Sequence, residues 1–354
     1  MATQSTKIKL RLSPQAERYA RRDAPVEARR MAARGALPLE PTDLATVLFA
    51  LMHDADAEVK ERARASLEAL PRPVLESVVA APAHPALLAF LAHLHAEDEA
   101  ICQALALNPA TDDRSIALLA ACPFRSVVDI VSQNQERMMR CDAIVEALGS
   151  NPLTGRAVIE RIMAFLGMSL DAPEDEGGEL DEAASEAAVL ELLGDEMAEF
   201  ATALSRESDD VVDDEITEGN LFAAVQNMTV MQKIKLARMG GTEARGLLIR
   251  DRNKVVATAA ISSPRVTESE VVGFAQSRGV CDEVLRMIAQ NREWTRSYQV
   301  KLALSTNPKV PQSTSMQFLN YLQDRDLKAI MKSRDVPSAV SSHARRLLQK
   351  KGKI

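Results

Sequence analysis

The chain has few aromatic residues, few cysteines and no long apolar run. Aromatic residues make up 3% of its 354 positions, while Ala, Leu, Val and Arg are abundant. This composition favours helix and argues against a large sheet. The four cysteines contain no Cys-x-x-Cys pair, and such spacing is not that of a zinc knuckle or an iron-sulfur site. We therefore expect reduced, buried thiols and no cofactor.

No apolar run is long enough to cross a bilayer, and residues 1–23 carry charges where a secretory signal would have an apolar core. The sequence therefore predicts a cytoplasmic protein without membrane insertion.

A catalytic or metal-binding grouping is also missing from the sequence. His93 and His95 are two residues apart, so on a helix they point in different directions and cannot share a metal as an i, i+4 pair does. The turn at Gly240 and Gly241 lacks the spacing of a phosphate-binding loop. We expect no catalytic, cofactor-binding or metal-binding residues. An enzyme is the third hypothesis, and it needs a pocket that the sequence does not indicate.

Charge is distributed unevenly along the chain. Residues 171–220 hold nineteen Asp and Glu against one basic residue, a local balance of −18, whereas the rest of the chain has a balance of +11. The basic excess gathers at both ends, with nine Lys and Arg against three acids in residues 1–35 and again in residues 320–354. An acidic insert therefore interrupts an otherwise basic protein.

Short polar markers recur at nearly equal intervals in the two halves of the chain. The steps between them are 26 and 17 residues in the first half and 28 and 16 in the second, which sum to 43 and 44. Corresponding markers are about 156 residues apart, which indicates two copies of one block. The markers are Asn108-Pro109, Gln133-Asn134 and Asn151-Pro152, then Ser263-Pro264, Gln290-Asn291 and Asn307-Pro308.

The segments between the markers have the pattern of short amphipathic helices. Proline disfavours helix at the preceding residue but suits a first helical turn, so each Asn-Pro predicts a stop followed by a start. Thr111, Thr154 and Thr267 stand where N-caps are expected, and Glu270 completes a capping box with Thr267. Each Gln-Asn to Asn-Pro interval is predicted to be one helix between two turns. The predicted fold class is all-α.

Residues 51–71, LMHDADAEVKERARASLEALP, carry the order Asp-x-Asp-x-x-Val-Lys-x-Arg-Ala, which resembles a HEAT-type repeat. Residues 249–264 resemble a weaker version, and the Ala-x-Asn-Pro-x-Thr units resemble bacterial leucine-rich-repeat-variant units. The resemblance covers roughly residues 40–167 and 221–348. It implies an α-solenoid of HEAT-like repeats in two duplicated blocks, and a bacterial source.

These observations divide the chain into four parts. We predict a basic N-terminal segment at 1–40, repeat block I at 41–167, an acidic insert at 168–220, and repeat block II with a basic tail at 221–354. The insert is rich in Pro, Gly and acids, which favours a solvated tether. It also contains apolar residues spaced as one amphipathic helix: Val189, Leu193, Met197, Phe200 and Leu204. This helix is a candidate regulatory element that docks on a basic surface, and the alternative is a plain spacer.

The Gln-Asn units are the best candidates for a specific surface, because repeated polar residues at one place in each repeat can line a shared binding face. The second unit lies among Arg, Tyr and the only Trp, types enriched at interaction hot spots. Alternatively, the two Asn residues only form local turns, and Trp294 and Tyr298 belong to the core. The candidate partner-binding residues are Gln290, Asn291, Arg292, Glu293, Trp294, Arg296, Tyr298, Lys301, Gln133, Asn134 and Arg137.

The first functional hypothesis is a non-catalytic scaffold or adaptor that binds another protein along its repeats, with the acidic insert as a regulator. The second is a nucleic-acid-binding protein that uses its basic ends, for which affinity would fall steeply with salt. The sequence indicates neither the identity of the partner nor an oligomeric state.

Overall fold

The computed structural model of the chain describes residues 10, 12–21, 23–166, 187–191, 204–205 and 218–353. Throughout these residues the regular elements are helices, so the predicted all-α class is confirmed. The chain divides into two compact units, Met1–Thr154 and Gly155–Ile354.

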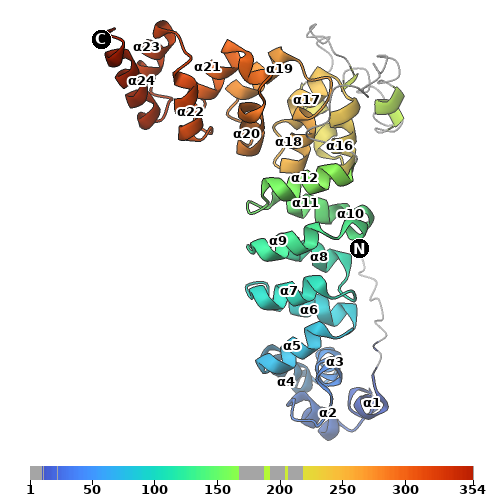
Figure 1. The fold of residues 1–354 in the computed structure, drawn as a ribbon. Coiled ribbons are helices and arrows are strands. Elements are labelled where there is room, and N and C mark those ends of the chain that lie inside the picture. The colour runs from blue at the N-terminus through green and yellow to red at the C-terminus, as the bar shows by residue number, and fades with distance from the viewer. Residues whose placement is uncertain are drawn as a thin grey trace. The chain divides into compact units, whose positions relative to one another are not determined.

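Unit 1 is built from short helices that follow one another in space largely as they do along the chain (Figure 1). α2 packs on α4, α3 on α5, α5 on α7, and α7 on α9, while α8 packs on α11. Among the described residues of this unit no helix is longer than twelve residues, and helices this short depend on packing against neighbours for their stability. The helices are α1 (Pro14–Ala20), α2 (Val26–Ala33), α3 (Pro41–Leu51), α4 (Ala57–Glu68), α5 (Arg72–Ala80), α6 (Pro85–Leu94), α7 (Glu99–Leu107), α8 (Asp113–Ala120), α9 (Arg125–Ser132), α10 (Gln135–Arg140) and α11 (Asp142–Ser150).

Unit 2 shows the same kind of packing. α16 packs on α18, α18 on α20, α19 on α21, and α22 on α24. Its helices are α12 (Arg156–Phe165), α15 (Glu218–Gln226), α16 (Val230–Met239), α17 (Thr242–Leu248), α18 (Lys254–Ile261), α19 (Glu268–Gln276), α20 (Asp282–Gln290), the 3-10 helix η2 (Trp294–Arg296), α21 (Tyr298–Thr306), α22 (Gln312–Leu319), α23 (Asp324–Lys332) and α24 (Ser338–Lys350).

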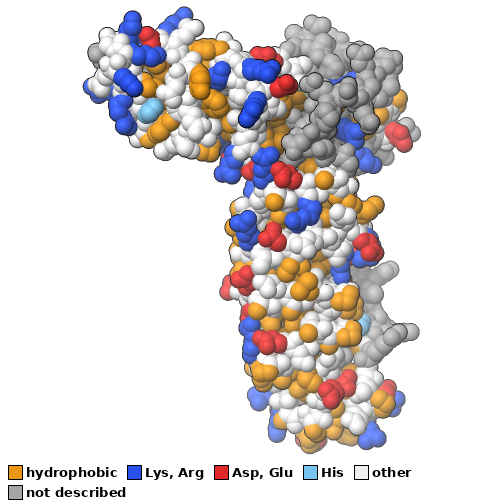
Figure 2. All heavy atoms as spheres, in the orientation of Figure 1, with side chains coloured by type: hydrophobic (Ala, Val, Ile, Leu, Met, Phe, Trp, Pro, Cys, Tyr) orange, Lys and Arg blue, Asp and Glu red, His pale blue; other side chains and the backbone are white. Residues whose placement is uncertain are grey.

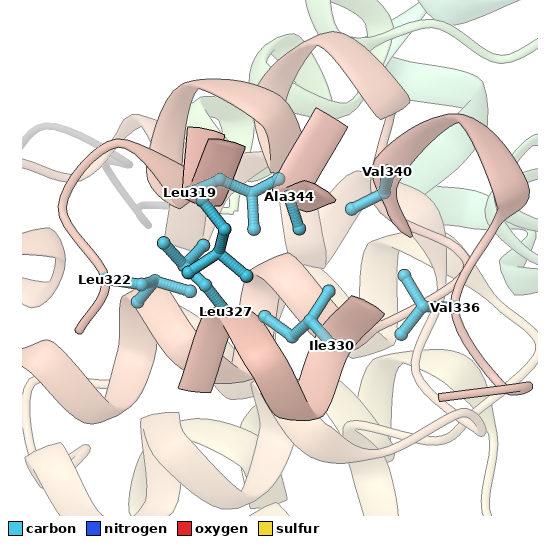
Figure 3. Close-up of a cluster of buried hydrophobic side chains, with 8 residues drawn as sticks. Leu319, Leu322, Leu327, Ile330, Val336, Val340 and Ala344 are labelled. Carbon is cyan, nitrogen blue, oxygen red and sulfur yellow. The ribbon is translucent and has the colours of Figure 1, made fainter. Parts of the chain in front are cut away.

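The last helices of unit 2 enclose a core of their own. Figure 3 shows Leu319 at the end of α22 and Leu322 in the following turn beside Leu327 and Ile330 of α23, and Ala344 of α24 lies in the same cluster. All of these side chains are almost completely buried. Apolar burial of this kind contributes about 1.5–3 kcal/mol for each large side chain, and it holds the ends of α22, α23 and α24 in fixed relative positions.

Three asparagines at helix ends make the same set of hydrogen bonds. The Nδ2 group of Asn108 donates to the carbonyls of Val79 and Ala81, at 2.6 and 2.7 Å, and its Oδ1 accepts from the backbone two residues ahead. Asn151 repeats the pattern on Ala120 and Cys122 at 2.8 and 2.9 Å.

Asn307 repeats it a third time, on Ala275 and Ser277 at 2.8 and 3.1 Å. Each asparagine is 4% exposed and ties the end of its helix to the end of an earlier helix. Carbonyls that a helix end leaves unpaired therefore find a donor from a neighbouring turn.

Both units contain a turn in which an aspartate accepts a backbone N–H and pairs with a basic side chain from an earlier helix. In the turn before α4, Asp54 accepts the backbone N–H of Asp56 at 2.8 Å and pairs with Arg29, and the Asp56 side chain caps the helix. In the turn before α18, Asp251 accepts from Asn253 at 2.8 Å and pairs with Lys233 at 2.9 Å, and Asn253 caps the helix. These are the two turns whose sequences resemble HEAT-type repeats.

The predicted capping of the helices was partly right. Thr267 and Glu270 form the expected capping box at the start of α19. The prediction for Thr111 and Thr154 was wrong by one residue, because Asp112 and Gly155 are the N-caps. The two threonine hydroxyls instead donate back to the carbonyls six residues earlier, at 2.7 and 2.5 Å.

The segments between the Gln-Asn and Asn-Pro markers were predicted as single helices, and the structure divides each of them. The first contains α10 and α11, separated by Cys141 in an extended conformation. The second contains η2 and α21, separated by Ser297, which is also extended. An extended residue cannot continue a helical hydrogen-bond ladder, so each segment becomes a short helix followed by a longer one.

The compact units and the predicted domains have different boundaries. Within residues 1–40, α1 packs on α3 and α2 packs on α4, so this part belongs to unit 1. α12 packs on α18 and belongs to unit 2, although it lies within the predicted block I. Side-chain packing, which decides these boundaries, is not visible in a charge or repeat pattern.

Candidate partner-binding surface

The first Gln-Asn unit forms a tight turn between α9 and α10. Gln133 is the C-cap of α9 and is exposed. Asn134 is also exposed, and its side chain accepts from the backbone N–H of Arg137 at 3.2 Å, which caps α10. Asn134 therefore has the local turn role that the sequence left as an alternative.

The side chain of Arg137 turns inward. It is 8% exposed, and its guanidinium donates to the carbonyl oxygens of Thr111 at 2.5 Å and Pro109 at 3.0 Å. The same group lies 3.2 Å from the carboxylate of Asp113. These bonds hold the turn that follows Asn108, so Arg137 contributes to packing and presents little surface to a partner.

The second Gln-Asn unit lies between α20 and η2. Gln290 is exposed, and its Oε1 accepts from the guanidinium of Arg156 on α12. Asn291 accepts from the backbone N–H groups of Glu293 and Trp294, at 2.9 and 3.2 Å. Both Asn residues therefore organise the turn that follows them, and neither has a positive φ.

The turn that begins at Asn291 presents charged and aromatic side chains. Arg292, Glu293 and Arg296 are exposed, and Trp294 is half-buried. The Arg296 carbonyl accepts from Nζ of Lys301 at 3.3 Å. This turn therefore exposes two arginines on a short segment that also carries Trp294, with the backbone fixed by Asn291.

Tyr298, the first residue of α21, fixes this turn against the next one. Its hydroxyl donates to the carboxylate of Asp326 on α23 and accepts from the backbone N–H of Gln323 at 3.1 Å. Burial and the adjacent Asp326 carboxylate raise the pKa of Tyr298. Tyr298 is half-buried, and its main role is to connect two turns. It presents little surface to a partner.

Lys301 and Tyr321 extend the surface across α21 and the end of α22. The ammonium of Lys301 is 5.4 Å from the centroid of the Tyr321 ring, within the range of a cation–π interaction. Tyr321 is 67% exposed, the third most exposed large hydrophobic residue in the described part of the chain, after Met139 and Leu107. An exposed aromatic ring held beside a cation is suited to contact with another molecule.

The start of α23 and the residue after α24 complete the surface. Nζ of Lys351 lies 3.0 Å from Asp324, which is the first residue of α23, and the lysine lowers the pKa of that carboxyl. Arg325 and Lys328 are exposed on the same helix. We call this set of side chains the basic edge: Arg292, Arg296, Lys301, Tyr321, Arg325, Lys328 and Lys351.

Most cations of the basic edge lack a carboxylate partner. Among the described residues, Arg292, Arg296, Arg325 and Lys328 form no ion pair, while Asp324 and Asp326 are engaged by Lys351 and Tyr298. Residues 278–353 contain fifteen Lys and Arg against six Asp and Glu. Figure 2 shows many basic and few acidic atoms over the C-terminal end of unit 2. The basic edge is therefore a positively charged surface with an aromatic residue inside it.

Sequence reasoning missed four residues of this edge: Tyr321, Arg325, Lys328 and Lys351. They lie 20 or more residues beyond Lys301, and no fixed interval connects them with the Gln-Asn unit. The only signal was the excess of basic residues in 320–354. Packing of α21 on α22 and of α23 on α24 brings the segments that carry them together, with Tyr321 beside Lys301 and Lys351 beside Asp324.

Two of the five residues predicted for the regulatory helix fall within the described part of the chain. Val189 and Leu204 are both fully buried, and the Leu204 carbonyl accepts from the backbone N–H of Gly241 at 2.7 Å. Leu193, Met197 and Phe200 lie outside the described residues, as does most of the segment 168–220.

The described residues contain no group of three or more side chains able to hold a metal ion. Cys102 and Cys122 are buried thiols, and burial raises the pKa of Cys102 to about 12. No helix in the described ranges has both the length and the apolar character needed to span a bilayer.

No protein-family model matches this chain, and comparison with curated proteins and with solved structures finds no significant similarity to either.

Proposed function

We propose that the protein is a non-catalytic α-solenoid scaffold whose two halves are duplicated blocks of HEAT-like repeats. The order of the helices supports the duplication. The interval from Asn108 to Asn151 contains α8, α9, the short α10 and α11, and the interval from Ser263 to Asn307 contains α19, α20, the short η2 and α21. The aspartate turns at Asp54 and Asp251 support HEAT-like repeats in both units, although their separation is not that of the two blocks.

The basic edge is the surface through which this scaffold binds its partner, an acidic segment of another protein. The observation that carries the proposal is the set of exposed cations without ion pairs on the turn at Asn291 and on α23, together with the exposed Tyr321 ring beside Lys301. Complementary charge guides such an encounter and selects the partner, while an aromatic anchor adds contact area. The fixed turns at Asn291 and Tyr298 lower the ordering cost of binding, because they hold the surface in place before the partner arrives.

The acidic insert regulates this surface by competing with the partner. Residues 171–220 have a charge balance of −18 and are part of the same chain, so they are present at a high effective concentration. Within the insert, the Leu204 carbonyl accepts from the backbone N–H of Gly241, the N-cap of α17. The insert therefore has a point of attachment to unit 2, the unit that carries the basic edge.

Binding of a labelled acidic peptide tests this proposal. The peptide has the sequence of residues 171–219, and its fluorescence anisotropy is measured with the full chain and with a chain that lacks these residues. The shortened chain should bind more tightly, because the internal competitor is gone. The double variant Arg296→Gln, Arg325→Gln should weaken binding about threefold to tenfold. This is the loss of affinity expected when two exposed ion pairs with the peptide are removed.

Lys235→Gln with Arg238→Gln on α16 is the matched control, because it removes the same charge from exposed positions of the same unit. The proposal fails if both double variants bind equally well, or if the full and shortened chains do not differ.

Nucleic acid is the second candidate partner, since basic residues beside an aromatic ring also suit phosphates and stacked bases. A single-stranded oligonucleotide is measured against the same variants at several salt concentrations. A steep fall of affinity with salt, together with tighter binding than the acidic peptide, would favour this alternative.

A further inference from the structure

A pocket between α2 and α4 of unit 1 is lined almost entirely by charged side chains. Its residues are Arg30, Arg34, Glu58, Val59 and Arg62. Arg30 and Arg34 are four residues apart, as are Glu58 and Arg62, so each pair occupies one face of its helix. The two helices pack side by side, and Val59 is the only apolar residue of the lining.

The two faces are held in register by contacts at both ends. Arg30 lies 2.9 Å from Glu58, and the hydroxyl of Ser66 donates to the carbonyl of Ala33 at 2.7 Å. Val59 is fully buried, so the wall of the pocket on α4 cannot shift freely. The pocket is therefore formed before any ligand binds.

Positive charge in this pocket exceeds negative charge. Three guanidinium groups face one carboxylate, that of Glu58. Arg30 is partly neutralised, since its terminal nitrogens also lie 3.4 Å from Glu27 and 3.6 Å from Asp56. Arg34 and Arg62 are exposed and form no ion pair within the described part of the chain.

The pocket has donors that a ligand can reach. Arg34 and Arg62 are exposed and line the pocket together with Arg30. Because neither Arg34 nor Arg62 forms an ion pair within the described residues, the N–H groups of both guanidiniums are available to one bound anion.

We propose that this pocket binds a phosphomonoester group. The two guanidinium groups without ion pairs, those of Arg34 and Arg62, match the two charges of a phosphate dianion, and arginine forks bind phosphate oxygens through paired hydrogen bonds. A single carboxylate would leave one guanidinium unpaired, and an apolar ligand would meet only Val59. This site is separate from the basic edge of unit 2, and its existence does not depend on the function proposed there.

The arginine Nε–Hε signals of the ¹⁵N-labelled full chain provide the test. Inorganic phosphate is titrated at constant ionic strength, with chloride as the replaced anion. The Arg30, Arg34 and Arg62 signals should shift in a saturable manner as phosphate enters the pocket that these side chains line. The double variant Arg34→Gln, Arg62→Gln should weaken phosphate binding by about tenfold or more, because it removes the charge-assisted hydrogen bonds that both guanidiniums give to the phosphate.

Arg64→Gln is the matched control, since Arg64 is also an exposed arginine of α4 but does not line the pocket. Circular dichroism melting of each variant establishes that it is folded. Non-saturable shifts, or equal affinity in the pocket variant and the control, would overturn the proposal.

A second arm separates the two sources of such a group. A phosphoserine peptide and its serine counterpart are titrated under the same conditions. Tighter binding of the phosphopeptide than of inorganic phosphate identifies a modified protein as the source, whereas equal affinity identifies a small phosphate. A serine peptide that binds as well as the phosphopeptide contradicts the assignment.

Discussion

Removing the side-chain amide of Asn307 should destabilise unit 2 strongly. In Asn307→Ala, the carbonyls of Ala275 and Ser277 lose donors at 2.8 and 3.1 Å, and the backbone N–H of Lys309 loses an acceptor at 3.0 Å. The site is 4% exposed, so water cannot readily replace these partners. Three buried hydrogen bonds of about 1 kcal/mol each predict a loss of about 2–4 kcal/mol in the free energy of unfolding.

Trp294 provides the assay, because it is the only tryptophan of the chain and lies in unit 2. Its fluorescence is followed during urea unfolding, so the transition of this unit is observed selectively. The predicted loss corresponds to a midpoint lower by about 1–2 M, given a slope of about 2 kcal/mol per M. Asn307→Asp should be at least as destabilising, since a carboxylate keeps the shape but cannot donate to the two carbonyls.

Asn320→Ala is the control, because Asn320 is exposed and donates only to carbonyls of its own helix, at 3.2 and 3.4 Å. Its midpoint should stay within about 0.3 M of the parent, the range of ordinary surface substitutions. The reasoning would be refuted if the Asn307 and Asn320 variants unfolded at the same urea concentration.

Three further predictions concern buried or paired ionisable groups. Glu270→Ala leaves the fully buried guanidinium of Arg245 without its bidentate partner at 2.9 and 3.2 Å, and should cost about 3–5 kcal/mol by urea unfolding; a loss below 1 kcal/mol would contradict it. Hydrogen bonding from nearby arginine lowers the pKa of Asp113, so its contribution is present above the unfolded pKa of about 3.9 and is lost as pH falls through the folded pKa. Asp113→Asn should therefore flatten the fall in stability between about pH 5 and pH 2, and an unchanged pH profile would disprove this. Burial raises the pKa of Cys102 to about 12, so a thiol reagent at pH 8 should modify the partly exposed Cys141 first, as mass spectrometry of labelled peptides can establish; faster reaction at Cys102 would refute the buried placement.

The sequence predicted the helical class and the position of several turns, because these depend on local chemistry. Proline after Asn108 and the pairing of Thr267 with Glu270 act within a few residues, and the structure has a turn and a capping box there. The interhelical role of Asn108 was not predictable in the same way. Its amide reaches a carbonyl 29 residues earlier, and only the packing of α5 on α7 brings the two together.

The candidate site shows the same limit. Arg137 and Arg296 lie in corresponding segments and are the same residue type, yet Arg137 is buried and Arg296 is exposed. Whether an arginine points inward depends on which carbonyls lie within its reach, and those belong to helices distant in sequence. For the same reason, the pattern of one turn did not indicate that Tyr321 would lie beside Lys301.

The difference between the two Gln-Asn turns explains why the basic edge is in unit 2. In unit 1 the third residue after Asn134 is Arg137, which uses its donors on the turn that follows Asn108. In unit 2 the third residue after Asn291 is Trp294, which has a single donor and cannot make such a set of bonds.

The turn after Ser263 is held differently as well. The Ser263 hydroxyl is buried without a hydrogen-bond partner, and Arg265, two residues later, donates to the carbonyl of Met239 at 3.3 Å. The buried Arg245 likewise donates to the carbonyl of Gly240, so the arginines that bond to carbonyls in this region come from segments other than the turn at Asn291. The arginines of that turn, Arg292 and Arg296, lie on the surface, where a partner of opposite charge can reach them.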